Sequence, residues 1–196
     1  MLPLATDTIS ALFAAVKQLR TSDPSLGARL HMHFVGTSNR STDDVMPVVL
    51  AHARAAGLAD IVTEHPQRIG YIDALQTLLS ASIILVLGST ERRYTASKLA
   101  PALASGRPLL VITHRESDIY RALDEVSRQG IAIAAFDDSG PSLATTDCIY
   151  RQLRAWVQHP PSERRVSERD LEAFSAVHLA RTLAGVLDMV TTETHG

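Results

Sequence analysis

Short apolar runs alternate with amphipathic stretches along most of the chain. Runs such as Ile83–Leu87 and Ile131–Phe136 do not alternate with polar positions, which is typical of strands buried on both faces of a parallel sheet. The pattern predicts strands at Leu30–Val35, Ile61–Thr63, Ile83–Leu87, Leu109–Thr113 and Ile131–Phe136. We therefore expect an α/β fold, a Rossmann-like parallel sheet of about five strands with helices on both faces.

Helices between these runs are marked by apolar spacing and by glycines. The phrases VMPVVLAHARAAG–LADIV, KLAPALASG–RPLLVIT and DIYRALDEVSRQG–IAIAAF each place a glycine between an amphipathic helix and an apolar run. Glycine at this position takes the left-handed conformation that ends a helix. Apolar residues recur at helical spacing from Ile9 to Leu19, and a capping pattern at Ser167–Asp170 predicts the start of a late helix.

The start of the chain departs from the usual order of a doubly wound sheet, which opens with a strand that feeds the first helix. Met1–Ala5 is short and is interrupted by Pro3. We therefore expect a fold that lacks its opening strand and has an unpaired edge beside Leu30–Val35. Because unpaired edges invite association, a homodimer that pairs along this edge is one expected assembly.

Composition narrows the function classes. A chain of 196 residues with 45% hydrophobic and 20% charged residues predicts one globular domain over 1–196. The formal net charge of −2 argues against a nucleic-acid partner, and no apolar run is long enough for a membrane span.

The single cysteine, Cys148, fits a reducing, cytoplasmic location. His31 and His33 share a strand face without a third ligand, so we expect no metal, and we expect no resident cofactor.

The turn after Ile83–Leu87 carries the strongest candidate chemistry. Small and hydroxyl residues lead into a helix whose first turn carries Lys98; they are Gly88, Ser89, Thr90, Thr95, Ala96 and Ser97. Unpaired amides at a helix N-terminus, backed by a cation, form a site for an anion such as a phosphate. The alternative is an ordinary cap, since serine and threonine often precede helices.

Basic residues recur in the loops that follow the predicted strands, where ligands of open α/β sheets bind. They are Arg40, Arg68, Arg92, Arg93, Lys98 and Arg115. In an acidic chain this arrangement predicts positive charge gathered on one edge, which would attract an anionic ligand such as a nucleoside diphosphate.

Four segments resemble the C-terminal, donor-binding domain of GT-B glycosyltransferases, a group with many bacterial members. They are LHMHFVGTS, EHPQRIGYIDAL, LVLGSTERRYTASKLAPALASGRPLLVI and the closing pair of helices. The resemblance implies a site for a nucleotide-diphosphate sugar, with the base against Glu64–Arg68 and the diphosphate against Thr95–Lys98. It implies substrate-binding roles for Gly36, Thr37, Ser38, His65, Arg68, Tyr71, Ser89, Glu91, Thr95, Ala96, Ser97 and Lys98.

The chain departs from this family in two ways. Many members carry two glutamates eight positions apart, and counting back from Gly106 places Arg93 and Pro101 there, with Glu91 near enough to replace one acid. The acceptor-binding domain of a GT-B enzyme is also missing. Two hypotheses remain. The chain is the donor-binding half of a glycosyltransferase, inactive without a separate acceptor-binding domain, or it is a non-catalytic Rossmann-like module that binds a nucleotide or a protein.

Overall fold

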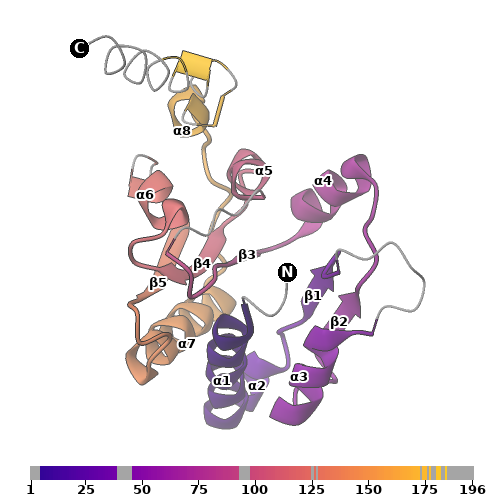
Figure 1. The fold of residues 1–196 in the computed structure, drawn as a ribbon. Coiled ribbons are helices and arrows are strands. Elements are labelled where there is room, and N and C mark those ends of the chain that lie inside the picture. Colours follow the sequence, from indigo (N-terminus) through magenta and orange to yellow (C-terminus); the bar gives the residue numbers. More distant parts are fainter. Residues whose placement is uncertain are drawn as a thin grey trace.

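The computed structural model describes residues 5–38, 46–92, 98–124, 126, 128–172, 174–175, 177, 180–181 and 184. Strands and helices alternate through most of this range (Figure 1). The strands are β1 (Met32–Val35), β2 (Val62–His65), β3 (Ile84–Leu87), β4 (Leu109–His114) and β5 (Ile131–Phe136). The helices are α1 (Thr6–Ser22), α2 (Pro24–Gly27), α3 (Val48–Ala56), α4 (Tyr71–Ser80), α5 (Leu99–Ala104), α6 (Asp118–Asp124), α7 (Leu143–Gln158) and α8 (Glu168–Glu172).

All strand pairs in the described residues are parallel, but they form two sheets. One holds β1 and β2, and the other has the order β3–β4–β5. The α/β class with helices on both faces is confirmed, whereas the expectation of about five strands in one sheet is wrong. In the usual doubly wound order the opening strand lies between the strands that correspond to β1 and β3. No described strand takes that place, so β1 and β3 do not pair.

Two clusters of buried side chains cover opposite faces of the strands. The larger joins α1, α3 and α7 to one face, and its members include Leu12 and Val16 of α1 and Ile112 of β4. The smaller packs α5 and α6 against the other face, with Leu103 and Val111 among its members. Every residue of β4 is buried, which explains the apolar run Leu109–Ile112, and the strand ends in the buried polar residues Thr113 and His114.

The predicted helical spacing of α1 is confirmed, because Ile9, Leu12, Phe13, Val16 and Leu19 are all buried. Gly57 and Gly106 follow the ends of α3 and α5 and have the expected left-handed conformation, with φ values of 75° and 69°. Gly130 also has a positive φ of 71°, but it lies in the turn before β5, and α6 already ends at Asp124. The glycine pattern therefore predicts two of these three helix ends.

The segment before α8 is held by a buried arginine that the sequence pattern did not indicate. The backbone amide of Arg164 donates to the carbonyl of Gly106 at 2.6 Å. Its guanidinium donates to the carbonyls of Gln129 at 3.1 Å and Leu103 at 3.3 Å. Burial lowers the pKa of this guanidinium. Arg164 thus anchors the chain to the loops before β4 and β5.

The capping pattern at the start of α8 is also confirmed. The amide of Ser167 donates to the Asp170 carboxylate at 2.9 Å, and the amide of Asp170 donates to the Ser167 hydroxyl at 3.2 Å. These reciprocal bonds satisfy two amides that a helix start leaves unpaired. Most of the late helix that this capping pattern was expected to begin lies outside the described residues.

Candidate functional site

The loops after β1 and β2 lie together at the carboxyl ends of these strands. The amide of Gly36 donates to the carbonyl of His65 at 2.8 Å, and the amide of Ser38 donates to the carbonyl of Pro66 at 3.0 Å. Gly36 has a φ of 67°, a conformation that favours glycine. The parallel pairing therefore extends past both strands and fixes the start of the candidate site.

Glu64 holds this region together from within β2. Its Oε1 accepts a hydrogen bond from the Thr37 hydroxyl at 2.5 Å, and its Oε2 accepts one from the Leu50 amide at 2.7 Å. Leu50 lies in the first turn of α3, where backbone amides lack partners within the helix. Both carboxylate oxygens are thus engaged in structure, and Thr37, a predicted ligand residue, is oriented by Glu64.

The side chain of Lys98, which lies in the connection between β3 and α5, extends to the loop after β1. Its Nζ lies 3.9 Å from the position that a Cβ atom on Gly36 would take, and the carbonyl oxygen of Gln67 lies 4.0 Å from that position. Lys98 is exposed and precedes α5 directly. The fold therefore brings together the ends of β1 and β2 and the residue before α5, as the sequence predicted for Gly36 and Lys98.

The turn after β3 packs closely on β4. A Cβ atom on Gly88 would lie 2.5 Å from the Thr113 hydroxyl and 3.0 Å from the Ile112 carbonyl oxygen. Ser89 is buried, and its hydroxyl accepts a hydrogen bond from the Glu91 amide at 3.0 Å. Ser89 therefore stabilises the turn, and Gly88 is required by the close approach of two strands.

A cluster of charged side chains at the ends of β3, β4 and β5 was missed in the sequence. His114 is buried; its Nδ1 accepts from the Glu116 amide at 3.1 Å, and its Nε2 lies 3.1 Å from Oδ1 of Asp138. Nδ1 is thus the acceptor, so Nε2 carries the proton that is donated to Asp138. Arg92 also binds Asp138, and it forms an ion pair with Glu116 at 3.0 Å.

This cluster affects the acidity of one carboxyl group. The hydrogen bond from Arg92, followed by its positive charge and the contact with His114, holds the pKa of Asp138 below its ordinary value. Arg92 is correspondingly engaged by two carboxylates. No local sequence pattern indicates this cluster, because its members come from the end of β4 and from the loops that follow β3, β4 and β5.

The remaining predicted site residues lie on the surface or outside the described chain. His65, Arg68 and Glu91 are exposed, and Tyr71, the first residue of α4, is 73% exposed. Thr95, Ala96 and Ser97 lie outside the described residues, as do Arg40 and Arg93. The structure thus joins Gly36, Thr37, Ser38 and Lys98 at one edge. Tyr71 opens α4, and the substrate-binding role that the resemblance implies for it stays a prediction.

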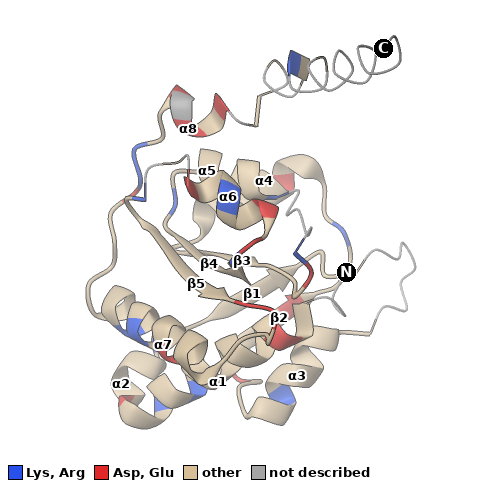
Figure 2. Cartoon of the chain, turned by 60° about the vertical axis from the view of Figure 1, so that its left-hand side comes forward, with Lys and Arg blue, Asp and Glu red and all other residues tan. Residues whose placement is uncertain are grey.

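The charge at this edge is mixed. Figure 2 shows acidic residues beside basic ones around the strand ends. Arg92 is neutralised by Asp138 and Glu116, while Lys98 makes no ion pair or hydrogen bond in the part of the chain that the structure describes. Arg115 is exposed as well, but Lys98 is the cation that lies beside Gly36, so we take it as the candidate cation for an anionic ligand at this edge.

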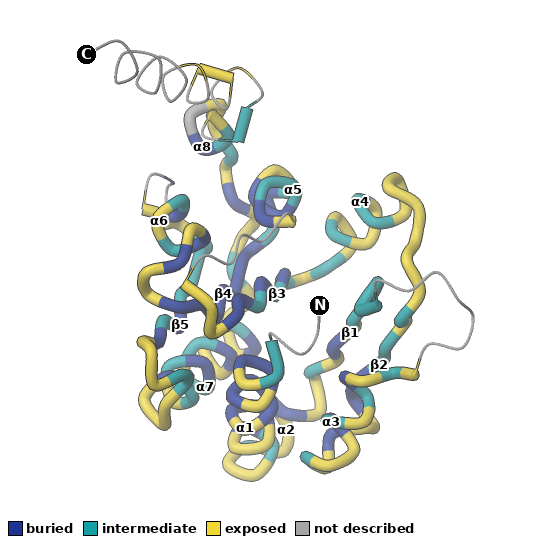
Figure 3. The backbone as a smooth tube through the Cα atoms, viewed as in Figure 1, coloured by how far each residue is buried: buried dark blue, intermediate teal, exposed yellow. Residues whose placement is uncertain are grey.

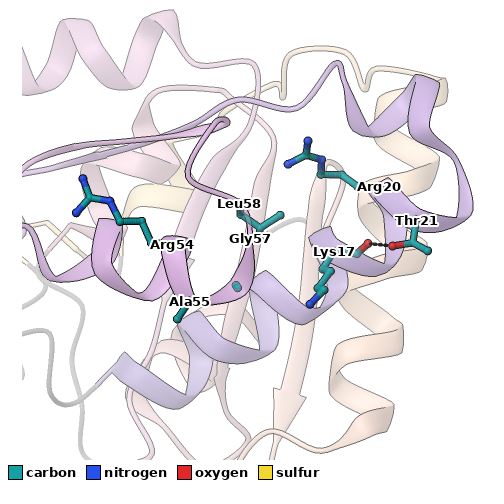
Figure 4. Close-up of a pocket in the computed structure, with 8 residues that line it drawn as sticks. Lys17, Arg20, Thr21, Arg54, Ala55, Gly57 and Leu58 are labelled. Carbon is teal, nitrogen blue, oxygen red and sulfur yellow. Dashed lines mark hydrogen bonds between the residues drawn. The ribbon is translucent and has the colours of Figure 1, made fainter.

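A depression of about 410 Å³ lies at the opposite end of the molecule, near the C-terminal ends of α1 and α3 (Figure 4). Its lining includes Lys17, Arg20 and Arg54. Cations at helix C-termini offset the negative end of the helix dipole, and Arg20 forms an ion pair with Asp60 at 2.7 Å. These basic residues therefore have a structural explanation, and we assign no ligand to them.

No protein-family model matches the chain, and no curated protein is significantly similar to it. Within the described ranges, no helix is long and apolar enough to cross a membrane. The rings of His31 and His33 lie 5.3 Å apart, and in the described part of the chain no three His, Cys, Asp or Glu side chains converge on a metal position.

Proposed function

We propose that the carboxyl edge formed by the loops after β1 and β2 and by Lys98 binds the diphosphate of a nucleotide-diphosphate sugar. The observation that carries this proposal is the position of the Lys98 amine, 3.9 Å from the place of a Cβ on Gly36. A lysine amine beside backbone that lacks a side chain suits a phosphate group, which needs positive charge and close access.

Lys98, and not a helix end, supplies most of the attraction in this proposal. The helix α5 spans six residues, Leu99–Ala104, so its dipole is small. Pro101 lies in its first turn and has no amide hydrogen to donate. A mobile ammonium group acts as a point charge that can follow a diphosphate, and the resulting contact is charge-assisted.

The resemblance to GT-B donor domains gives this binding site its proposed role. The chain would hold the sugar donor, and Lys98 would stabilise charge on the departing nucleoside diphosphate, as fixed cations do for developing anions. Transfer would require a separate acceptor-binding domain, so the isolated chain would be inactive. We assign no catalytic residue.

A non-catalytic nucleotide-binding module is the second candidate, and Pro101 favours it. In the resemblance this position belongs to a glutamate that contacts the donor, whereas a proline inside α5 offers no such group. Both candidates use the same diphosphate site. They differ in whether a sugar on the diphosphate adds binding energy.

Isothermal titration calorimetry tests the proposal with the unmodified chain. We expect a nucleoside diphosphate to bind about tenfold or more tightly than the matching nucleoside, because only the diphosphate reaches Lys98. UDP, GDP and ADP, each with its nucleoside, cover the undetermined base. A gain from an attached sugar supports the donor-binding role, and equal affinity supports the non-catalytic module. Failure of every nucleoside diphosphate to bind at millimolar concentration contradicts both.

A further inference from the structure

In the described residues, β1 pairs with a strand only on its β2 side, and β3 pairs with a strand only on its β4 side. The other edges of β1 and β3 face each other, and we call these two edges the sheet split. The strands follow one another across the molecule in the order β2, β1, β3, β4, β5 (Figure 1). On β1, the amides of Met32 and Gly36 donate to the β2 side. Since successive residues of a strand point their backbone groups to opposite sides, His33 and Val35 present theirs to the split.

The same reasoning applies to β3. The amides of Ile84 and Gly88 donate to carbonyls on the β4 side at 2.8 and 2.7 Å. Leu85 and Leu87 therefore present their amides and carbonyls away from β4. The carboxyl ends of both strands lie on the same side of the molecule, since the loop after β1 lies beside Lys98, which belongs to the connection that leads from β3 to α5.

One helix layer already joins the two sheets. The larger buried cluster contains Met32 of β1, Ile112 of β4 and the apolar face of α1, and Leu85 and Leu87 pack against it while staying partly exposed. The next strand, β4, is buried throughout. The two sheets thus share a core on the α1 side, and burial is incomplete beside the split.

On the other face, the helix α4 lacks a buried residue. Its sequence YIDALQTLLS is amphipathic, yet none of its positions is buried, and Figure 3 shows it without the dark blue that marks α1 and β4. Ile72 is 63% exposed and Leu79 is 50% exposed. An apolar helix face normally packs on a sheet. Here Leu78 packs partly against the smaller buried cluster, while Ile72 and Leu79 remain exposed.

The position of α1 shows where a further strand would connect. The hydroxyl of Thr8, in the first turn of α1, donates to the carbonyl of Gly88 at 3.0 Å. The chain therefore enters α1 at the carboxyl end of β3. A strand that runs parallel to β1 and β3 would end at this same edge, and a short loop would connect it to α1.

We propose that the sheet split accepts one extended apolar segment, joined directly to the N-terminal end of α1, as a parallel strand between β1 and β3. The segment would form backbone hydrogen bonds with His33, Val35, Leu85 and Leu87. Its side chains would be apolar on both faces, because one face meets α1 and the other meets α4. The result is a single sheet in the usual doubly wound order, with α4 covered.

The test compares the unmodified chain with two extended forms. One carries Val-Ile-Val-Ile-Val ahead of Met1, so that five residues of the chain separate the added segment from Thr6, where α1 begins. The control carries Val-Pro-Val-Pro-Val, which cannot donate the same hydrogen bonds. Amide hydrogen exchange is measured at Val35, Leu85 and Leu87, which face the split, and at Phe34 and Val86, which face the paired strands.

In the unmodified chain, we expect the three amides at the split to exchange faster than Phe34 and Val86. The Val-Ile extension should slow their exchange about tenfold or more and raise the melting temperature, and the proline control should do neither. Three results would overturn the proposal: equal protection of both sets in the unmodified monomer, no difference between the two extensions, or protection that appears only with dimer formation in light scattering. The comparison of Val35, Leu85 and Leu87 with Phe34 and Val86 is made in the unmodified chain. It therefore tests the proposal even if an extended chain folds poorly.

Discussion

Replacing Lys98 with alanine is expected to weaken the binding of a nucleoside diphosphate by about 1–3 kcal/mol, which is the usual size of a charge-assisted contact. Binding of the bare nucleoside should change little, because its base and ribose carry no negative charge. The Lys98 side chain is exposed and lies beside Gly36, so its removal leaves the core intact. Calorimetry with UDP and uridine, or with the pair that binds best, measures both effects.

The chain contains a matched control for this experiment. Its two lysines are Lys17 and Lys98, and Lys17 lines the depression at the opposite end of the molecule. The change Lys17→Ala removes the same charge from the protein but should leave diphosphate binding unchanged. Equal losses for the two variants would indicate a general effect of net charge and would contradict a site at Lys98, as would equal losses for UDP and uridine.

The change Gly88→Ala is expected to lower the free energy of unfolding by about 1–3 kcal/mol, the usual cost of overpacking. The added methyl group would lie 2.5 Å from the Thr113 hydroxyl and 3.0 Å from the Ile112 carbonyl oxygen, so strand β4 would have to shift. Urea denaturation followed by circular dichroism gives the free energy of unfolding for wild type and variant.

The control for this prediction is Gly70→Ala. Gly70 has a φ of −57°, which any residue adopts, and a Cβ atom there would meet a terminal oxygen of Asp73, which can move. We expect a change within about 0.5 kcal/mol, as for most surface substitutions. If Gly88→Ala is as stable as Gly70→Ala, the turn after β3 is not packed closely against β4.

Local patterns in the sequence predicted the strands well, because burial on both faces leaves a continuous apolar run. The range Ile131–Phe136 matches β5 at both ends, and Ile83–Leu87 differs from β3 by one residue. Pairing between strands is a long-range property, however, and no local pattern reports it. The sequence therefore predicted one sheet, whereas the described strands form two.

The amphipathic pattern of α4 illustrates the same limit. Ile72, Leu75 and Leu79 of α4 lie at helical spacing, which is typical of a helix with an apolar face. The pattern does not say what covers that face. In the structure none of these positions is buried, although Leu78 packs partly against the smaller buried cluster.

The candidate site was partly predictable. Gly36 and Lys98 come from different loops, and the rule that ligands bind at the carboxyl ends of parallel strands was enough to expect them together. The expected anion site at the start of α5 is weaker, because that helix has six residues. The contact between His114 and Asp138 could not be inferred, since it depends on how the loop after β5 turns back toward the end of the neighbouring strand β4.

The most direct measurement uses the two lysines as probes. Reductive methylation with ¹³C-formaldehyde labels Lys17, Lys98 and the α-amino group, and the spectra of Lys17→Ala and Lys98→Ala assign the two lysine signals. We expect a nucleoside diphosphate to shift the Lys98 signal in a saturable way and to leave the Lys17 signal nearly unchanged. The bare nucleoside should shift neither signal appreciably. Saturable binding that leaves the Lys98 signal in place, or shifts both lysines equally, would contradict a diphosphate site at this edge of the sheet.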